Sequence, residues 1–103
     1  MVSISERIHL LELDVVDSTN RLAYDLGFSG AKPWTIVNAL EQTSGRGRRQ
    51  NDWLSPRGNL FLSAILKPIN GLKRWSELSF VISLAVADTV AEVADRSSIG
   101  LKW

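Results

Sequence analysis

The residues with the clearest chemical potential lie in one short segment, Gln42-Thr43-Ser44-Gly45-Arg46-Gly47-Arg48-Arg49, followed four positions later by Trp53. Glycine lets the backbone turn its N–H groups toward a ligand, and each guanidinium presents a fixed fork of donors that matches phosphate or carboxylate oxygens. We call residues 42–49 the signature segment. Its composition predicts contact with an anion, and the first hypothesis is a polyanion or a nucleotide.

Positive charge is concentrated around this segment. The net charge of the chain is +1, yet four of its twelve basic residues lie between Ser44 and Gly58, opposed by the single acid Asp52. A local excess of this kind focuses positive potential on one place. The distribution favours a binding pocket over a broad nucleic-acid-binding surface.

The chain has 103 residues, of which 45% are hydrophobic and 22% are charged. This length and composition indicate a soluble globular chain of at most one domain. The absence of cysteine excludes a disulfide framework and a cysteine-ligated metal site, and it fits a reducing compartment. Residues 1–7 lack the apolar core of a signal peptide, and the best apolar run, residues 80–87, is too short to span a bilayer. We therefore expect a cytoplasmic protein without membrane contact.

The regular elements that must position these residues can be placed by pattern. Residues 8–16 and 34–37 predict strands, and Asp17-Ser18-Thr19-Asn20 offers four good N-cap types before a short helix that Gly27 stops at its C′ position. A third strand is predicted at residues 60–66. The long connection before it exceeds the usual limit of about 12 to 15 residues for a structureless loop, which indicates a functional loop.

The C-terminal third predicts a helix whose apolar stripe, from Leu78 to Val93, packs on the sheet and is ended by Ser97-Ser98. Residues 99–103 begin a further strand. Because domains rarely end inside an apolar strand, we expect the chain to be a piece of something longer. The fold class is α/β (α+β): a mixed sheet with packed helices, in which strands joined through a helix are parallel and strands flanking the signature segment are antiparallel.

Four motifs follow one another along the chain: Asp17-Ser18-Thr19-Asn20, the signature segment with Trp53, Ser55-Pro56-Arg57-Gly58-Asn59-Leu60, and Leu101-Lys102-Trp103. Their order resembles biotin protein ligase, the enzyme that biotinylates acyl-CoA carboxylases. Gln-Thr-x-Gly-Arg-Gly-Arg is the most specific of them, and the match covers nearly the whole chain. The resemblance implies the catalytic-domain fold of biotin and lipoate ligases, which is class II synthetase-like, with residues 1–103 as its N-terminal portion.

The resemblance also implies a two-step reaction. Biotin's carboxylate attacks the α-phosphate of ATP to give biotinyl-5′-AMP, and a lysine of a biotin carboxyl carrier domain then takes the biotinyl group. Mg²⁺ accompanies the ATP, and no protein-bound metal is expected. Two anions must meet, so donors fixed in a dry site are required.

Site residues follow by matching positions. Biotin contacts are expected at Ser18, Thr19, Asn20, Gln42, Gly45, Arg46, Gly47 and Arg48. Contacts with ATP or the adenylate are expected at Arg46, Arg48, Trp53 and Lys102, and Arg48 and Lys102 are the expected catalytic residues. Gly45 and Gly47 are expected to let the segment close over the ligand as a loop. Ser18 and Thr19 have an alternative role as helix caps, and Trp53 has one as a core residue.

Other residues are expected to be structural: His9 lacks a second histidine or cysteine for a metal site, and Trp34 and Trp75 are expected to pack. The chain also departs from the family. Gln50 and Asn51 stand where glycine and arginine are usual, which removes one cation. The rest of the motif begun by Lys102-Trp103, a later lysine, the small C-terminal barrel and an N-terminal winged helix are missing, so we expect no DNA binding and an inactive fragment.

Two other functions stay open. A nucleic-acid-binding module could use the arginines on phosphates, although it would usually spread basic residues over a face. A lipoate or octanoyl transferase shares the fold and the acyl chemistry, but the signature segment matches the biotin pattern. The carrier protein is undetermined by the sequence, as is the choice between a monomer and a homodimer.

Overall fold

The computed structural model describes residues 7–67 and 76–101, without the side chains of residues 50 and 96. These residues belong to two compact units, Met1–Lys67 and Pro68–Trp103. The first unit contains every predicted site residue except Lys102, which lies outside the described residues together with Trp75 and Trp103.

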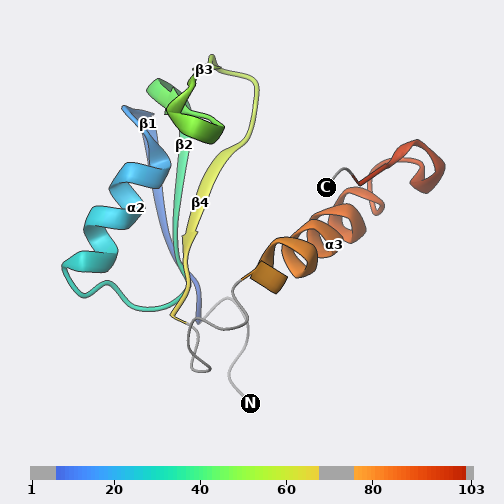
Figure 1. Ribbon diagram of the computed structural model, residues 1–103, viewed down its shortest axis with the longest axis horizontal. Helices are drawn as coiled ribbons and strands as arrows, with labels where there is room; N and C mark the ends of the chain where they lie inside the picture. Colours follow the sequence, from blue (N-terminus) through green and yellow to red (C-terminus); the bar gives the residue numbers. More distant parts are fainter. Residues whose placement is uncertain (1–6, 68–75, 102–103) are drawn as a thin grey trace. The chain divides into compact units, whose positions relative to one another are not determined.

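The first unit is built on a mixed sheet of four strands, β1 (His9–Val16), β2 (Thr35–Arg46), β3 (Asp52–Ser55) and β4 (Phe61–Ile65), which Figure 1 shows with β2 in the middle. β1 is parallel to β2, with Leu13 opposite Ala39, because the connection between them runs through helix α2 (Thr19–Phe28). β3 and β4 are antiparallel to β2 and pair with its two ends in turn. The predicted mixed sheet is confirmed.

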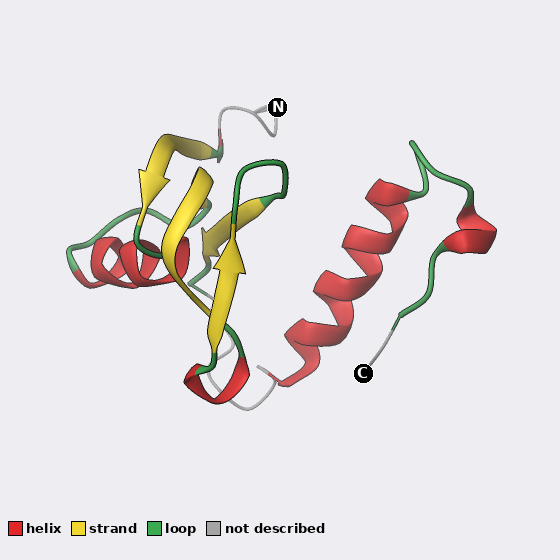
Figure 2. Ribbon diagram, turned by 90° about the horizontal axis from the view of Figure 1, so that it is seen from above, coloured by secondary structure: helices red, strands yellow, loops and turns green. Residues whose placement is uncertain are grey.

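Helix α2 packs on one face of the sheet, as Figure 2 shows. Ala23 of the helix is buried with Val37 of β2 and Ile65 of β4. Around these three pack the partly buried side chains of Leu13, Leu22, Leu26 and Ala31. The small core fixes the helix against β2 and β4, and so fixes where the N-terminus of α2 lies.

Both ends of α2 are closed by local hydrogen bonds. Ser18 is the N-cap, and its hydroxyl accepts a hydrogen bond from the Arg21 N–H at 3.3 Å. At the other end the N–H of Ala31 bonds to the carbonyl of Leu26 at 3.0 Å, and Gly30 adopts a φ of +95°. This is a Schellman motif with Gly30 at C′, so the prediction that Gly27 stops the helix was wrong.

The prediction of a long loop without regular structure before residue 60 was also wrong. β2 continues through Arg46, and a 3₁₀ turn, η1 (Arg48–Gln50), joins it to β3. The glycines and arginines suggested a loop by composition, but pairing with β3 supplies partners for that part of β2, and tertiary context outweighs propensity. Trp34 precedes β2 with a φ of +66° and is about half exposed, so its predicted packing role is not seen in this unit.

The second unit contains helix α3 (Leu78–Val90) and a 3₁₀ turn, η3 (Arg96–Ser98). Apolar residues occupy all sides of α3, so the helix is confirmed but a single stripe is not, and none of its residues is buried. The helix ends well before Ser97, and residues 99–101 are not in a strand, contrary to prediction. Packing of α3 on a sheet stays a prediction. Among the described residues, no helix is long and apolar enough to cross a membrane.

The two glycines near the end of α2 should respond oppositely to alanine. A Cβ on Gly27 would lie 3.8 Å from Ile65 Cγ2, an ordinary contact, so Gly27→Ala should stabilise the protein by about 0.5 to 1 kcal/mol through helix propensity. Gly30→Ala should destabilise it by about 1 kcal/mol, because φ is positive there. Urea unfolding followed by circular dichroism measures both changes. Equal effects of the two substitutions would contradict this assignment of the helix end.

The start of α2 should respond to acid. The Arg21 guanidinium, followed by the Ser18 backbone N–H, holds the pKa of the Asp17 carboxyl below its ordinary value of 3.8. A lowered folded-state pKa contributes stability that is present above pH 3.8 and is lost as the pH falls through the lowered value. The Tm of Asp17→Asn should therefore lie below that of the wild type at neutral pH, and the two should converge in strong acid. A difference that is constant with pH would refute this.

Candidate functional site

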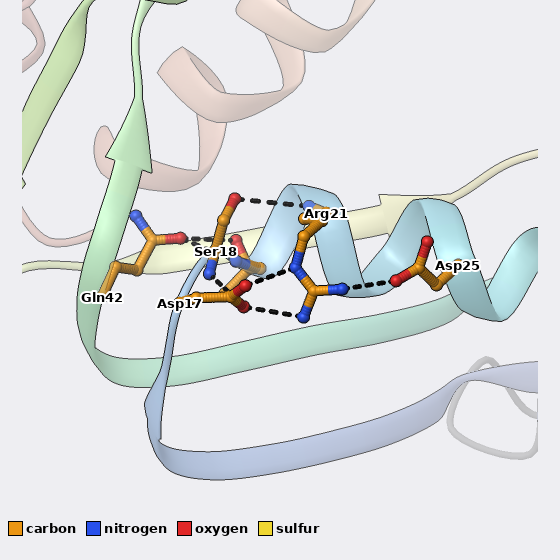
Figure 3. A network of polar contacts seen from close by, with 6 residues as sticks. Asp17, Ser18, Arg21, Asp25 and Gln42 are labelled. Atoms are coloured by element: carbon orange, nitrogen blue, oxygen red, sulfur yellow. Dashed lines mark hydrogen bonds and ion pairs between the residues drawn. The ribbon is translucent and has the colours of Figure 1, made fainter.

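The amide of Gln42 joins β2 to the first residue of α2. Gln42 Oε1 accepts a hydrogen bond from the Thr19 backbone N–H at 2.8 Å and a second from Thr19 Oγ1 at 3.1 Å, and Figure 3 shows the Gln42 side chain pointing to the start of the helix. Thr19 is 4% exposed. The first N–H groups of a helix lack partners within the helix, so Gln42 supplies one from a different element.

Two serines extend this contact to the other strands. Thr19 Oγ1 lies 2.9 Å from Ser63 Oγ of β4, and Gln42 Nε2 donates to Ser55 Oγ of β3 at 3.1 Å. Ser55 in turn donates to the carbonyl oxygen of Trp53 at 3.1 Å. We call Thr19, Gln42, Ser55 and Ser63 the polar network. Among the described residues, every buried side-chain polar atom has a partner.

Sequence reasoning did not assign Ser55 or Ser63 a place in the site. Ser63 lies between Phe61 and Ile65, which are both buried, so it occupies an inward position of β4. A polar residue in the period-two apolar pattern of a strand was the available signal. Ser55 is 4% exposed, and it appeared only as part of a motif.

Gly45 lies inside β2, in contact with this network. The register of β2 with β3 shifts between Gln42 and Gly45, which marks a β-bulge, and the Ser44 N–H turns to the Asp17 carbonyl at 2.8 Å. A Cβ on Gly45 would lie 2.4 Å from Ser55 Oγ and 2.7 Å from the Trp53 carbonyl oxygen. Gly45 therefore lies in a strand where close packing requires a glycine, and not in a loop as expected. Closure of the segment over a ligand stays a prediction.

The arginines near the signature segment divide into two groups. Arg46 pairs with its cross-strand partner Asp52 at 2.6 Å, and Arg57 pairs with Asp14 and, at 3.5 Å, with Glu41. In the part of the chain that the structure describes, Arg48 and Arg49 have no carboxylate partner. Arg46 and Arg57 thus have their charge balanced. The unbalanced charge of Arg48 and Arg49 lies in the turn between β2 and β3, residues 47–51, which we call the hairpin tip.

That tip carries an open groove lined by Arg46, Gly47, Arg48, Asn51 and Trp53. Trp53 is 64% exposed, and its ring lies against Gly47, where a Cβ would approach Trp53 Cε3 to 3.1 Å. Arg49 has a φ of +58° and a ψ of +30°, a left-handed conformation that a non-glycine residue adopts at a cost of about 1 kcal/mol. An exposed indole beside cations suits stacking on a flat base better than core packing.

A second groove lies at the start of α2. This second groove is lined by Asp17, Ser18, Asn20, Arg21, Tyr24, Ser44 and Arg46, so Arg46 lines both grooves. The structure thus brings together the predicted residues Ser18, Thr19, Asn20, Gln42, Gly45, Arg46, Gly47, Arg48 and Trp53 around one end of the sheet. His9 is exposed, and in the described ranges no three histidine, cysteine or acidic side chains are grouped as a metal site.

The comparisons of this chain with known proteins agree with one another on the family to which it belongs. The model of the Biotin/lipoate A/B protein ligase family matches residues 12–102. The bifunctional ligase/repressor BirA of Bacillus spizizenii is 35% identical over 96 residues, which are 92% of this chain and 29% of that protein. The biotin–[acetyl-CoA-carboxylase] ligase of Paracoccus denitrificans is 38% identical over 90 residues, 84% of this chain and 36% of that protein.

Solved structures agree with the sequence comparisons. The biotin protein ligase of Aquifex aeolicus in complex with biotin and ATP matches with a TM-score of 0.69 and 33% identity, over 82% of this chain and 35% of that one. The Leishmania major enzyme in complex with biotinyl-5-AMP matches with a TM-score of 0.69 and 30% identity, with the same coverage. The chain therefore spans about a third of the length of these relatives.

The Bacillus relative is named a repressor as well as a ligase, so the expected absence of DNA binding stays a prediction. The fold, the signature segment and the family match nevertheless agree on one assignment. This chain belongs to the biotin/lipoate A/B protein ligase family, and its mixed α+β fold matches the catalytic domains of biotin protein ligases.

Proposed function

We propose that this chain carries the biotin-binding residues and part of the ATP-binding residues of a biotin protein ligase. In the reaction the biotin carboxylate oxygen attacks the α-phosphorus of ATP, and pyrophosphate leaves. The amine of a carrier-protein lysine then attacks the carbonyl carbon of biotinyl-5′-AMP, and AMP leaves. The observation that carries the proposal is the polar network beside two grooves that share Arg46.

The polar side chains at the start of α2 fit the ureido head of biotin, which has two N–H donors and a carbonyl acceptor. Hydroxyls and amides can serve both kinds of group, and Ser18, Thr19, Asn20 and Gln42 provide them at the start of α2. Ser18 and Thr19 are buried and already held by hydrogen bonds, so they need no reordering when a ligand arrives. Capping by Ser18 and ligand contact therefore coexist.

The hairpin tip fits the anionic part of the reaction. Arg48 has no carboxylate partner among the described residues, so its charge is available to meet the biotin carboxylate and the α-phosphate. Arg46 joins it at the boundary of the two grooves, Gly47 gives close access to the backbone, and Trp53 covers the adenine. Lys102 is assigned to the phosphates, and Mg²⁺ would arrive with the ATP and offset its charge.

The partner of the second step is a biotin carboxyl carrier domain of an acyl-CoA carboxylase, and the reaction is placed in the cytoplasm. The assembly state, monomer or homodimer, is left open. Support for biotin and ATP as ligands comes from the Aquifex aeolicus relative, which was solved with both. The second candidate is a lipoate or octanoyl transferase, because the family description names lipoate as well as biotin.

An adenylation assay separates the two candidates. The complete gene product is used whatever its length, because the chain spans about a third of its relatives. With ATP, Mg²⁺ and radiolabelled biotin it should accumulate acid-labile biotinyl-5′-AMP, whereas labelled lipoate and octanoate should give none. Labelling with either of those acids and not with biotin would transfer the assignment to the second candidate.

Charge changes at the hairpin tip should alter adenylate retention in opposite directions. Arg48→Gly removes an unbalanced cation, so biotinyl-5′-AMP should dissociate at least about tenfold faster. Asp52→Asn releases Arg46 from its exposed partner, so dissociation should slow by about two- to fivefold. Stopped-flow release of the adenylate measures both rates.

The matched control for Asp52→Asn is Asp25→Asn, which makes the same charge change beside Arg21 on α2. It should leave the dissociation rate within about 1.5-fold of the wild type, because Asp25 lines neither groove and Arg21 keeps its second partner, Asp17. Retention that is unaffected by Arg48→Gly would remove Arg48 from its role. Equal effects of the two aspartate substitutions would mean that net charge matters and the Arg46–Asp52 pair does not.

A further inference from the structure

Ser55 lies between Gln42, which contacts the start of α2, and Trp53 of β3. Its hydroxyl accepts from Gln42 Nε2 at 3.1 Å and donates to the Trp53 carbonyl oxygen at 3.1 Å. The residue is 4% exposed, and it pairs directly with Gln42 across the β2–β3 ladder. One hydroxyl thus links the amide beside the start of α2 to the strand that carries the exposed indole.

A primary amide can be turned by 180° about its last bond, which exchanges its oxygen and nitrogen. Thr19 needs an acceptor at this place, because both its backbone N–H and its hydroxyl point to Gln42 Oε1. Ser55 provides an acceptor on the other side of the amide, because its own proton is used on the Trp53 carbonyl. The two contacts therefore select the same orientation of the Gln42 amide.

Gly45 leaves space for the Ser55 hydroxyl because it has no Cβ. A Cβ on Gly45 would lie 2.4 Å from Ser55 Oγ, a distance that a real side chain could not keep, and 3.0 Å from Gln42 Nε2, a tight contact. The glycine of the signature segment therefore keeps Ser55 and Gln42 in contact. Nothing in the expected list of biotin or ATP contacts accounts for a buried serine at this position.

We propose that Ser55 is a positioning residue for biotin recognition: it acts through Gln42, whose amide it holds in the orientation that a ureido group meets. This role rests on the proposed function, because it has meaning only if the ligand is biotin. It predicts an effect of Ser55 on biotin affinity that depends on Gln42. Loosening of the hairpin as a whole would instead weaken ATP binding as well.

The test is a double-mutant cycle by calorimetric titration of the complete gene product with biotin. Ser55→Ala should weaken biotin binding by about two- to tenfold, the range expected for one hydrogen bond. Gln42→Met keeps the side-chain length and removes both amide atoms, so it should weaken binding more strongly. Adding Ser55→Ala to Gln42→Met should change affinity by less than about twofold, because the partner through which it acts is gone.

Thr35→Val is the matched control, since it deletes a hydroxyl that donates to the Lys32 carbonyl at the other end of β2 and keeps the side-chain shape. It should leave biotin affinity unchanged, and ATP affinity should stay within about twofold of the wild type in Ser55→Ala. If Ser55→Ala does not fold, Ser55→Cys replaces it: the sulfur is a weak acceptor, so an intermediate loss is expected.

The outcomes separate the two claims. Additive losses in the double mutant, or unchanged biotin affinity in Ser55→Ala, would overturn the positioning role while the proposed function stands. Equal weakening of ATP and biotin binding would overturn it in favour of a structural role. A folded wild-type protein that does not bind biotin would overturn the proposed function itself, and the positioning role with it.

Discussion

The acceptor that Gln42 offers to Thr19 is the interaction on which the rest of the site depends. It closes the N-terminus of α2 with an atom from β2, and through Ser55 and Ser63 the same contacts reach β3 and β4. Removing one partner from a buried hydrogen bond leaves the other unsatisfied, at a cost of about 1 to 3 kcal/mol. The network therefore fixes four elements relative to one another before any ligand is present.

Shape and charge are assigned to different residues around this network. The bulge and Gly45 allow β3 to approach so closely that Ser55 meets Gln42, and they leave the arginines to the hairpin tip beyond. There, Arg46 is balanced by Asp52, and Arg48 is not balanced by any carboxylate in the described residues. Under the proposed function, we expect that recognition of the neutral, hydrogen-bonding head of biotin and of the anionic part of the ligand can be changed separately by substitution.

Much of the fold was predictable because its signals are local. Strand β1, the strand ending at Ile65 and a helix start capped within residues 17–20 follow from apolar runs and capping residues, and the parallel and antiparallel pairings follow from the connections. The continuation of β2 through Arg46 was not predictable, because its stability comes from pairing with β3 and from the Ser44–Asp17 contact, both non-local. Gly30 was missed as the helix end because the Schellman hydrogen bonds depend on Ala31 reaching back to Leu26.

The candidate site was predicted by motif and not by geometry. The motifs named Gln42 and Thr19 as ligand contacts, but no pattern indicated that the two bind each other, or that Ser55 and Ser63 complete the set. In the sequence, Arg46, Arg48, Arg49 and Arg57 form one local excess of positive charge, and the sequence does not show which of them are paired with carboxylates. The carboxylate partners of Arg46 and Arg57, which come from β1, β2 and β3, are brought near by folding alone.

The central claim is that the Thr19 backbone N–H is held by Gln42 in the ligand-free protein. Hydrogen exchange of backbone amides, followed by NMR without biotin or ATP, tests it most directly. The account predicts that the Thr19 amide exchanges as slowly as the amides of the paired part of β2, although it belongs to the first turn of a helix. Exchange of Thr19 as fast as that of its exposed neighbour Asn20 would contradict the account.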